Sequence, residues 1–188
     1  MTELTDFSFG RNYSCEILDE IPSAEIAQRR FFPGDLAGGQ DGLLVRVTPE
    51  GGEPWLGMFA FGKLGSAGIS RVLSLPDPEK LCVVSRGAGY VVAARDPRSW
   101  EMVRAVPIID VRAVPSAGMV VFANFTEMVA YGAEGPRWRT KRLAWDGLKI
   151  VEVTDTSIIG EYWDIREEAT QKFEVDLATG AHHGSVEG

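Results

Sequence analysis

The sequence predicts an all-β, antiparallel protein, a meander of about four blade-like units with a period of about 38 residues. Three observations predict it. Short runs rich in β-branched and aromatic residues alternate with Gly, Pro, Asn and Asp along most of the chain, a pattern typical of strands and turns. One stretch repeats without a gap, and helix-like sequence is scarce. We therefore expect roughly 13 short strands.

The repeat is clearest between residues 81–104 ("LCVVSRGAGYVVAARDPRSWEMVR") and 119–142 ("MVVFANFTEMVAYGAEGPRWRTKR"). Each copy predicts a strand, a tight turn, a second strand, an acidic turn and a third strand that opens with a tryptophan. Two weaker copies begin at Leu43 and Ser157, one period before the first copy and one after the second. Such units close either as a small incomplete propeller or as a two-sheet sandwich, and the pattern favours neither.

The remaining elements follow in chain order. Residues 1–188 are expected to form a single domain, with an N-terminal arm over 1–40, a short helix within 22–30 and repeat units over 43–188. Further strands are expected at 107–114 and in a hairpin over 142–153, which turns at Asp146-Gly147. The segment "KFEVDLATGAHHGS" near the C-terminus predicts the second strand of a hairpin, its turn and the start of another strand.

The segments "WDGLKIVEV", "IIGEYWD" and "FEVDLATG" carry a resemblance. With them, the C-terminal third resembles small, uncharacterised bacterial all-β proteins built from blade-like hairpin repeats, and "FEVDLATG" is similar to the hairpin end of quinoprotein-type propeller repeats. The resemblance implies the blade architecture and brings no activity with it. Two Trp-Asp pairs lie only 18 residues apart rather than one blade apart, which argues against a WD-repeat protein.

Composition limits the classes of function. With 45% hydrophobic and 24% charged residues, the chain is typical of a globular domain. Cys15 and Cys82 have no metal-ligand spacing and form no disulfide framework. The first residues lack the pattern of a secretory signal, and no apolar run is long enough to span a membrane. The sequence therefore favours a cytoplasmic location without membrane binding.

The net charge of -8 argues against nucleic-acid binding, which needs a basic surface. Residues 1–94 and 95–188 each have a net charge of -4, so the charge is even between the two halves. The only histidines, His182 and His183, are adjacent, and neighbouring residues of a strand point to opposite faces. They are therefore poorly placed to hold one metal ion, and the sequence predicts no metal, no cofactor and no catalytic residue. One of them acting as a lone general base is the alternative.

Two segments are candidate binding surfaces. In "RWRTKR", Arg137, Arg139 and Lys141 share one strand face, which suits an acidic partner or a phosphorylated ligand, or serves as a solvated edge. In "QRRFFPGD", the residues Arg29, Arg30, Phe31 and Phe32 suit either a protein contact or an arm that inserts its phenyl rings into the core.

These features favour a non-enzymatic protein-interaction or assembly module, with a partner of either charge. An acidic immunity-type protein that masks a basic toxin is one specific form. The alternative is a small-molecule-binding or hydrolytic domain with a site formed by inter-strand turns, at Asp96, Glu134 and Asp176. Homo-oligomer formation through edge strands also remains open.

Overall fold

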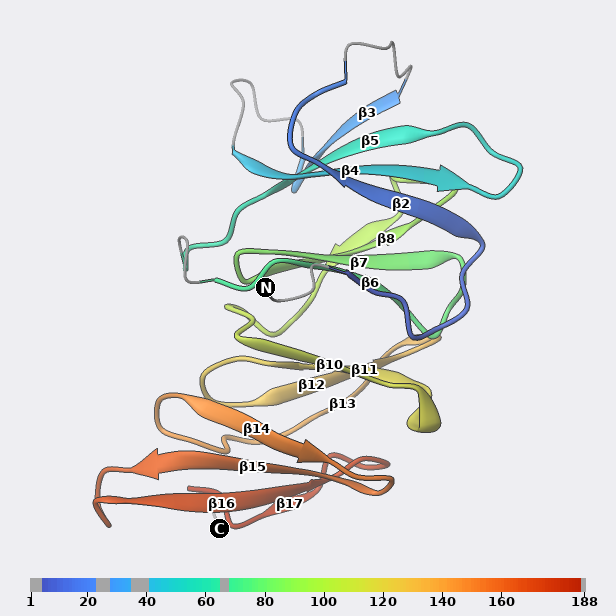
Figure 1. The fold of residues 1–188 in the computed structure, drawn as a ribbon. Helices are drawn as coiled ribbons and strands as arrows, with labels where there is room; N and C mark the ends of the chain where they lie inside the picture. Colours follow the sequence, from blue (N-terminus) through green and yellow to red (C-terminus); the bar gives the residue numbers. More distant parts are fainter. Residues whose placement is uncertain (1–4, 23–27, 35–40, 65–67, 187–188) are drawn as a thin grey trace. The chain divides into compact units, whose positions relative to one another are not determined.

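A computed structural model describes residues 5–22, 28–34, 41–64 and 68–186 and confirms the all-β prediction (Figure 1). Within these residues, 17 strands form four sheets, and the single helix is a 3-10 turn, η2 (Pro115–Ala117). The chain forms two compact units, Met1–Val103 and Arg104–Gly188, with two sheets in each. The sheets are numbered 1 to 4 below.

Sheet 1 has the order β2-β4-β5-β3. Its strands are β2 (Tyr13–Leu18), β3 (Gln28–Phe32), β4 (Gly42–Pro49) and β5 (Trp55–Ala60). The strands β4 and β5 form the antiparallel hairpin that the repeat predicts. In contrast, β3 pairs in parallel with β5 at the edge of the sheet, so the pairing is not antiparallel throughout.

Sheet 2 has the order β1-β6-β7-β8-β9. Its strands are β1 (Thr5–Asp6), β6 (Arg71–Ser74), β7 (Lys80–Ser85), β8 (Ala88–Ala93) and β9 (Trp100–Met102). The short strand β1 pairs in parallel with β6, and the other neighbours are antiparallel. The β7–β8 turn consists of Arg86 and Gly87, both with positive φ, as a tight two-residue hairpin requires.

Sheets 1 and 2 share an aromatic core. The ring of Phe32 stacks on Phe59 with centroids 4.5 Å apart, and Trp100 meets Phe32 edge-on at 5.6 Å. Trp55 is 1% exposed, and its indole Nε1 donates a hydrogen bond of 2.7 Å to the carbonyl of Ala94. This bond ties sheet 1 to the end of β8, while the aromatic side chains fill the space between the two sheets.

Sheet 3 is an antiparallel meander in chain order. Its strands are β10 (Asp110–Val114), β11 (Met119–Ala123), β12 (Met128–Gly132) and β13 (Gly135–Arg139). Sheet 4 repeats the meander with β14 (Leu148–Val153), β15 (Ser157–Asp164), β16 (Ala169–Asp176) and β17 (His182–His183). All of its neighbouring strands are antiparallel.

The core of the second unit joins these two sheets. Met128 and Trp138 contribute from sheet 3, and Ile158 and Phe173 contribute from sheet 4. The indole Nε1 of Trp138 donates a hydrogen bond of 2.8 Å to the carbonyl of Leu177, 39 residues along the chain. The bond from Trp55 to the carbonyl of Ala94 spans 39 residues as well, so the same tie recurs in both units.

The repeat corresponds to real strands. Residues 81–104 contain β7, β8 and β9, and residues 119–142 contain β11, β12 and β13. Trp100 and Trp138 lie on the last strand of sheet 2 and of sheet 3, where both pack against the core of their own unit. The histidine pair forms β17, as the segment "KFEVDLATGAHHGS" predicts.

Other parts differ from the prediction. The N-terminal segment supplies the strands β1, β2 and β3 rather than an arm. The expected helix over 22–30 is not confirmed, because residues 28–30 begin β3 and residues 23–27 lie outside the described part. Residues 142–147 contain no strand, so Asp146-Gly147 turns no hairpin. That segment connects sheets 3 and 4 instead. Whether the chain forms a single domain stays a prediction.

Candidate functional site

The candidate site is the outer face of sheet 4, the face opposite the core that it shares with sheet 3. In Figure 1, the strands of this sheet lie side by side in orange and red. Inward-pointing residues such as Ile150 and Phe173 are buried. Their strand neighbours point outward in three cross-strand rows, which comprise Trp163 and Thr170; Lys149, Glu161 and Lys172; and Glu152, Ile159, Glu174 and His183. None of these outward residues is buried.

Exposed apolar side chains gather on this sheet and on the turn after β15. Trp163 is 56% exposed, whereas Trp55 and Trp138 are 1% and 9% exposed. Val151, at the bulge in β14, is 54% exposed, and Ile165 in the β15–β16 turn is 72% exposed. Single exposed apolar residues are common on protein surfaces. An exposed tryptophan on a paired strand is less ordinary, since tryptophan is enriched at the centres of protein interfaces.

The segment that forms this sheet and its turns is the most acidic part of the chain for its length. Residues 146–186 contain nine Asp or Glu and three Lys or Arg, a net charge of -6, whereas residues 95–145 contain five and eight, a net charge of +3. Lys149 pairs with Glu161 at 3.0 Å, and His183 lies 3.5 Å from Glu174. The other seven carboxylates of 146–186 form no ion pair within the described residues.

A polar hollow of about 290 Å³ lies at the end of this face, where β16 and β17 meet. It brings together two carboxylates, two imidazoles and two hydroxyl groups. Its lining residues are Thr156, Ser157, Glu174, Asp176, Ala181, His182 and His183. The hollow therefore contains the histidine pair and one of the three carboxylates that the sequence offered as a turn site.

Several polar groups of the hollow already serve the local turns. The Asp176 carboxylate accepts hydrogen bonds from the backbone N–H and the hydroxyl of Thr179, and these hold the pKa of Asp176 below its ordinary value. The Ser157 hydroxyl lies 3.1 Å from that of Thr154. Neither group is thus arranged as a nucleophile with a neighbouring base.

The histidines lie on opposite faces of β17, as predicted. His183 is opposite Glu174 in the outward row, and His182 is opposite Val175, which is buried in the core. In the part of the chain that the structure describes, no group of three or more His, Cys, Asp or Glu side chains could hold a metal ion.

The predicted turn carboxylates are all exposed, and each lies in or beside the turn that precedes the last strand of its sheet. Asp96 belongs to the first unit, where its carboxylate accepts a hydrogen bond from the N–H of Arg98. Glu134 and Asp176 belong to the second unit, in the turns after β12 and at the end of β16. Of the three, Asp176 alone lines the hollow described above.

The cations of "RWRTKR" alternate as predicted, with Arg137 and Arg139 exposed on β13 and Trp138 buried between them. Arg139 pairs with Glu127, and this contact is the main reason why the pKa of Glu127 is lowered. Arg137 donates a hydrogen bond of 2.9 Å to the carbonyl of Ala117. Lys141 is exposed just beyond the strand.

The segment "QRRFF" follows the same alternation on β3. Phe32 is 3% exposed within the aromatic core, and Phe31 is 43% exposed. Arg29 is exposed and Arg30 is partly buried. The ring of Phe32 therefore inserts into the core, as the core-insertion interpretation predicts. The ring of Phe31 faces outward, where a protein contact would need it. A binding role for these residues, and for Arg137, Arg139 and Lys141, stays a prediction.

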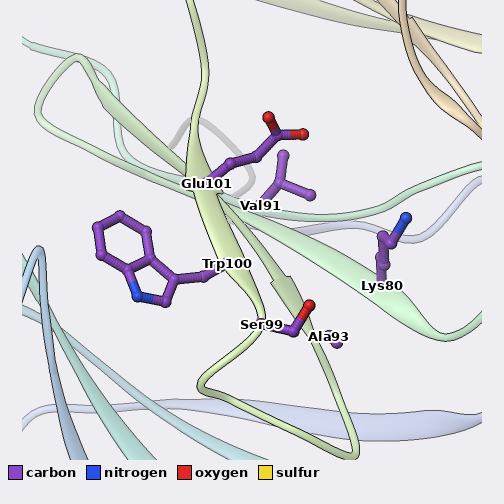
Figure 2. Close-up of a pocket in the computed structure, with 6 residues that line it drawn as sticks. All are labelled: Lys80, Val91, Ala93, Ser99, Trp100 and Glu101. Carbon is purple, nitrogen blue, oxygen red and sulfur yellow. The ribbon is translucent and has the colours of Figure 1, made fainter.

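A second hollow, of about 250 Å³, lies on sheet 2 in the first unit. Figure 2 shows Val91 and Ala93 of β8 between Lys80 of β7 and Glu101 of β9, with the Trp100 indole pointing away from the Glu101 carboxylate. The Lys80 ammonium is 3.1 Å from an oxygen of Asp77. The hollow thus offers two opposite charges and a small apolar floor, and it holds no nucleophile–base pair.

Comparison with known proteins adds little. No protein-family model and no curated protein matches the chain. Among solved structures, one match is a chain from the S. cerevisiae complex of a Dbp5 variant bound to Nup159, a Gle1 variant, IP6 and ADP, with a TM-score of 0.39 and 10% identity. It covers 92% of this chain and 51% of that chain, so the protein spans about half the length of its match. A likeness of this size identifies no family.

Within the described residues, no helix is long and apolar enough to cross a membrane.

Comparing the net charges of the two halves of the sequence hides one feature. The net charge changes from +3 in residues 95–145 to -6 in residues 146–186. Counting charge by predicted blade instead of by half would have revealed it. The outward position of Trp163 could also have been read from its strand, since Tyr162 and Trp163 are adjacent and only one of them can face the core.

Proposed function

We propose that the protein is a non-enzymatic, cytoplasmic protein-interaction module that docks a partner on the outer face of sheet 4. The observation that carries the proposal is the exposure of Trp163 on a fully paired strand. The large buried aromatic residues of this unit face the core, and Trp163 does not belong to that core. A partner that covered the Trp163 ring would therefore remove apolar surface from water that the fold itself leaves exposed. Covering half of an indole removes on the order of 100 Å² of surface from water, a gain of about 2.5 kcal/mol.

The shape of the site suits docking. Eight consecutive residue pairs join β15 and β16, so the face is held by a regular ladder and needs little ordering when a partner binds. The strands β14, β15, β16 and β17 have 6, 8, 8 and 2 residues and lie about 4.8 Å apart, so the face presents roughly 400 Å². That is less than the roughly 800 Å² that each partner contributes to a standard interface, so the neighbouring turn must take part.

The β15–β16 turn extends the surface. Ile165 is largely exposed, and the Arg166 guanidinium lies 5.0 Å from the centre of the Trp145 ring. Asp164 accepts a hydrogen bond of 2.8 Å from the N–H of Arg166 and so fixes the start of the turn. Trp145 and Arg166 add an aromatic–cationic contact of the kind enriched in protein interfaces.

The test is capture of the natural complex. The untagged protein, purified gently from its own source, is analysed by native mass spectrometry beside the variants Trp163→Ser and Met102→Ser. Met102 is the matched control, because it is a large apolar residue, 40% exposed, on an edge strand of the other unit. We expect a stoichiometric second polypeptide with the wild type and with Met102→Ser, and its loss with Trp163→Ser. A partner retained equally by all three proteins would contradict the proposal.

A second candidate function is small-molecule binding or hydrolysis in the hollow at β16 and β17. It is favoured by the convergence of Glu174, Asp176, His182 and His183 on one hollow of about 290 Å³, close to the smallest volumes typical of ligand pockets. A bound non-protein mass that is lost with both His183→Ala and Glu174→Gln would support it. A wild-type protein that carries no such mass would count against it.

We also propose that the four sheets derive from a blade-like repeat of the kind found in propellers and in small bacterial all-β proteins. The support is the shared 39-residue spacing of the bonds from Trp55 to Ala94 and from Trp138 to Leu177. A propeller-type repeat predicts that a synthetic duplication of sheets 3 and 4 folds cooperatively. An unfolded product would contradict the repeat origin.

A further inference from the structure

We infer that the partner of sheet 4 is a basic protein segment, an inference that rests on the proposed docking function. Residues 146–186, which form sheet 4 and its turns, have a net charge of -6. Residues 1–94 have a net charge of -4, and residues 95–145 have one of +3. The segment that exposes Trp163 is therefore the most acidic part of the chain for its length.

The unpaired carboxylates border the face at both ends of β15. Glu152 and Asp155 lie on β14 and in the turn before β15, whereas Glu167 and Glu168 lie in the turn after it. All four are exposed, and none of their carboxylates takes part in a hydrogen bond or an ion pair within the described residues. Unpaired carboxylates are acceptors only, so they complement the donors of Lys and Arg side chains.

This placement gives the partner a recognisable pattern. β15 spans eight residues, so the two acidic ends lie roughly 25 Å apart along the strand. Trp163 lies between them, near the Glu167 end. The complementary segment therefore carries two cationic groups separated by about eight extended residues, with an apolar side chain that covers the indole.

Charge also argues against the other occupants. A second copy of the chain that docks through its own sheet 4 would bring a net charge of -6 against the same charge, and nucleic acid or an anionic membrane would be repelled in the same way. Attraction to a basic partner would accelerate association and weaken steeply as salt screens it. Salt dependence is therefore a direct readout of the inference.

The probe is a synthetic peptide with two clusters of three arginines about eight residues apart and leucine between them. Its controls carry glutamine or glutamate in place of every arginine. Binding to the full chain is followed by fluorescence anisotropy and by backbone amide NMR. We expect the arginine peptide to shift the signals of β15 and Trp163, and to lose about tenfold in affinity between about 50 mM and about 500 mM salt.

The variant Glu152→Gln/Asp155→Asn/Glu167→Gln/Glu168→Gln should weaken the arginine peptide by about tenfold. The matched control is Asp19→Asn/Glu20→Gln/Glu50→Gln/Glu53→Gln, four exposed residues of the first unit with the same changes. It should bind as the wild type does. Equal losses in both variants would overturn the inference, because any four charges would then suffice.

The remaining outcomes separate the two proposals. If the glutamine peptide shifts Trp163 as strongly as the arginine peptide does, the docking surface stands and the basic partner is refuted. If none of the three peptides shifts sheet 4, and Trp163→Ser retains its natural partner, both are refuted. Self-association through sheet 4, seen by sedimentation and abolished by Trp163→Ser, would identify a second copy as the occupant and overturn the inference.

Discussion

Replacing Trp138 by Phe tests the tie between sheets 3 and 4. Trp138 is 9% exposed, and its indole donates a hydrogen bond of 2.8 Å to the carbonyl of Leu177, a residue that is 2% exposed. Phenylalanine keeps an aromatic ring but has three ring atoms fewer, and the donor nitrogen is one of the three. A buried carbonyl left without its donor costs about 1–3 kcal/mol. The smaller ring costs about 1 kcal/mol more, so we expect a loss of about 2–4 kcal/mol in the free energy of unfolding.

The assay has to resolve the two units, because they need not unfold together. Native-state hydrogen exchange does so: the amides of β13 and β16 should lose protection by the stated amount, while those of β7 and β8 keep theirs. Trp163→Phe is the control, since that ring is 56% exposed and its replacement should change stability by less than about 0.5 kcal/mol. Equal effects of the two substitutions would refute the role assigned to the indole bond.

Three further predictions follow from local contacts. Gly160→Ala should destabilise sheet 4 by about 1–3 kcal/mol in urea unfolding, because a Cβ there would lie 2.1 Å from Cζ of Phe173, whereas Gly10→Ala meets nothing within 4 Å and should be neutral. The pKa of Glu127 is lowered chiefly by its hydrogen bond from Arg139, so this carboxylate stabilises the fold fully above pH 4.5 and loses that effect as the pH falls through its lowered pKa. Arg139→Gln should therefore raise the Glu127 pKa in an NMR titration and reduce the loss of stability on acidification; an unchanged titration would contradict this. Burial raises the pKa of the Cys15 thiol to about 11 and that of Cys82 further, so alkylation of Cys15 near pH 8 should be about 100-fold slower than that of a free thiol, with both thiols reacting fast once the chain is unfolded.

Local pattern was sufficient for most of the fold. Between Leu81 and Arg139, strand runs, turn residues and the repeated tryptophan identify strands that pair with their sequence neighbours, so periodicity alone orders them. The N-terminal strands β1 and β3 could not be found in this way. Each joins a strand far along the chain, in parallel, and such pairing leaves no local signature. The hairpin predicted at Asp146-Gly147 is wrong for a related reason, since the N–H of Gly147 donates a hydrogen bond to the carbonyl of Phe125, in the distant turn between β11 and β12.

The candidate site was predictable in part. The opposite orientation of His182 and His183 follows from strand geometry, and the structure agrees. Arg137 and Arg139 were predicted as binding residues from their spacing alone. Spacing does not reveal that Arg139 forms an ion pair with Glu127 or that Arg137 donates a hydrogen bond to the carbonyl of Ala117. The significance of Trp163 depends on knowing which face of β15 is covered, and only the packing of sheet 4 against sheet 3 decides that.

The parallel pairing of β1 with β6 also bears on how the chain resists self-association. Thr5 and Asp6 lie alongside Val72 and Leu73, so the strand edge that β6 would otherwise expose is occupied by the chain's own N-terminal segment. An unoccupied edge of this kind is a template for pairing with another molecule. Losing the pairing of β1 would thus cost little of the core and yet expose the edge of β6 to other molecules, so this short strand protects the protein from association at high concentration.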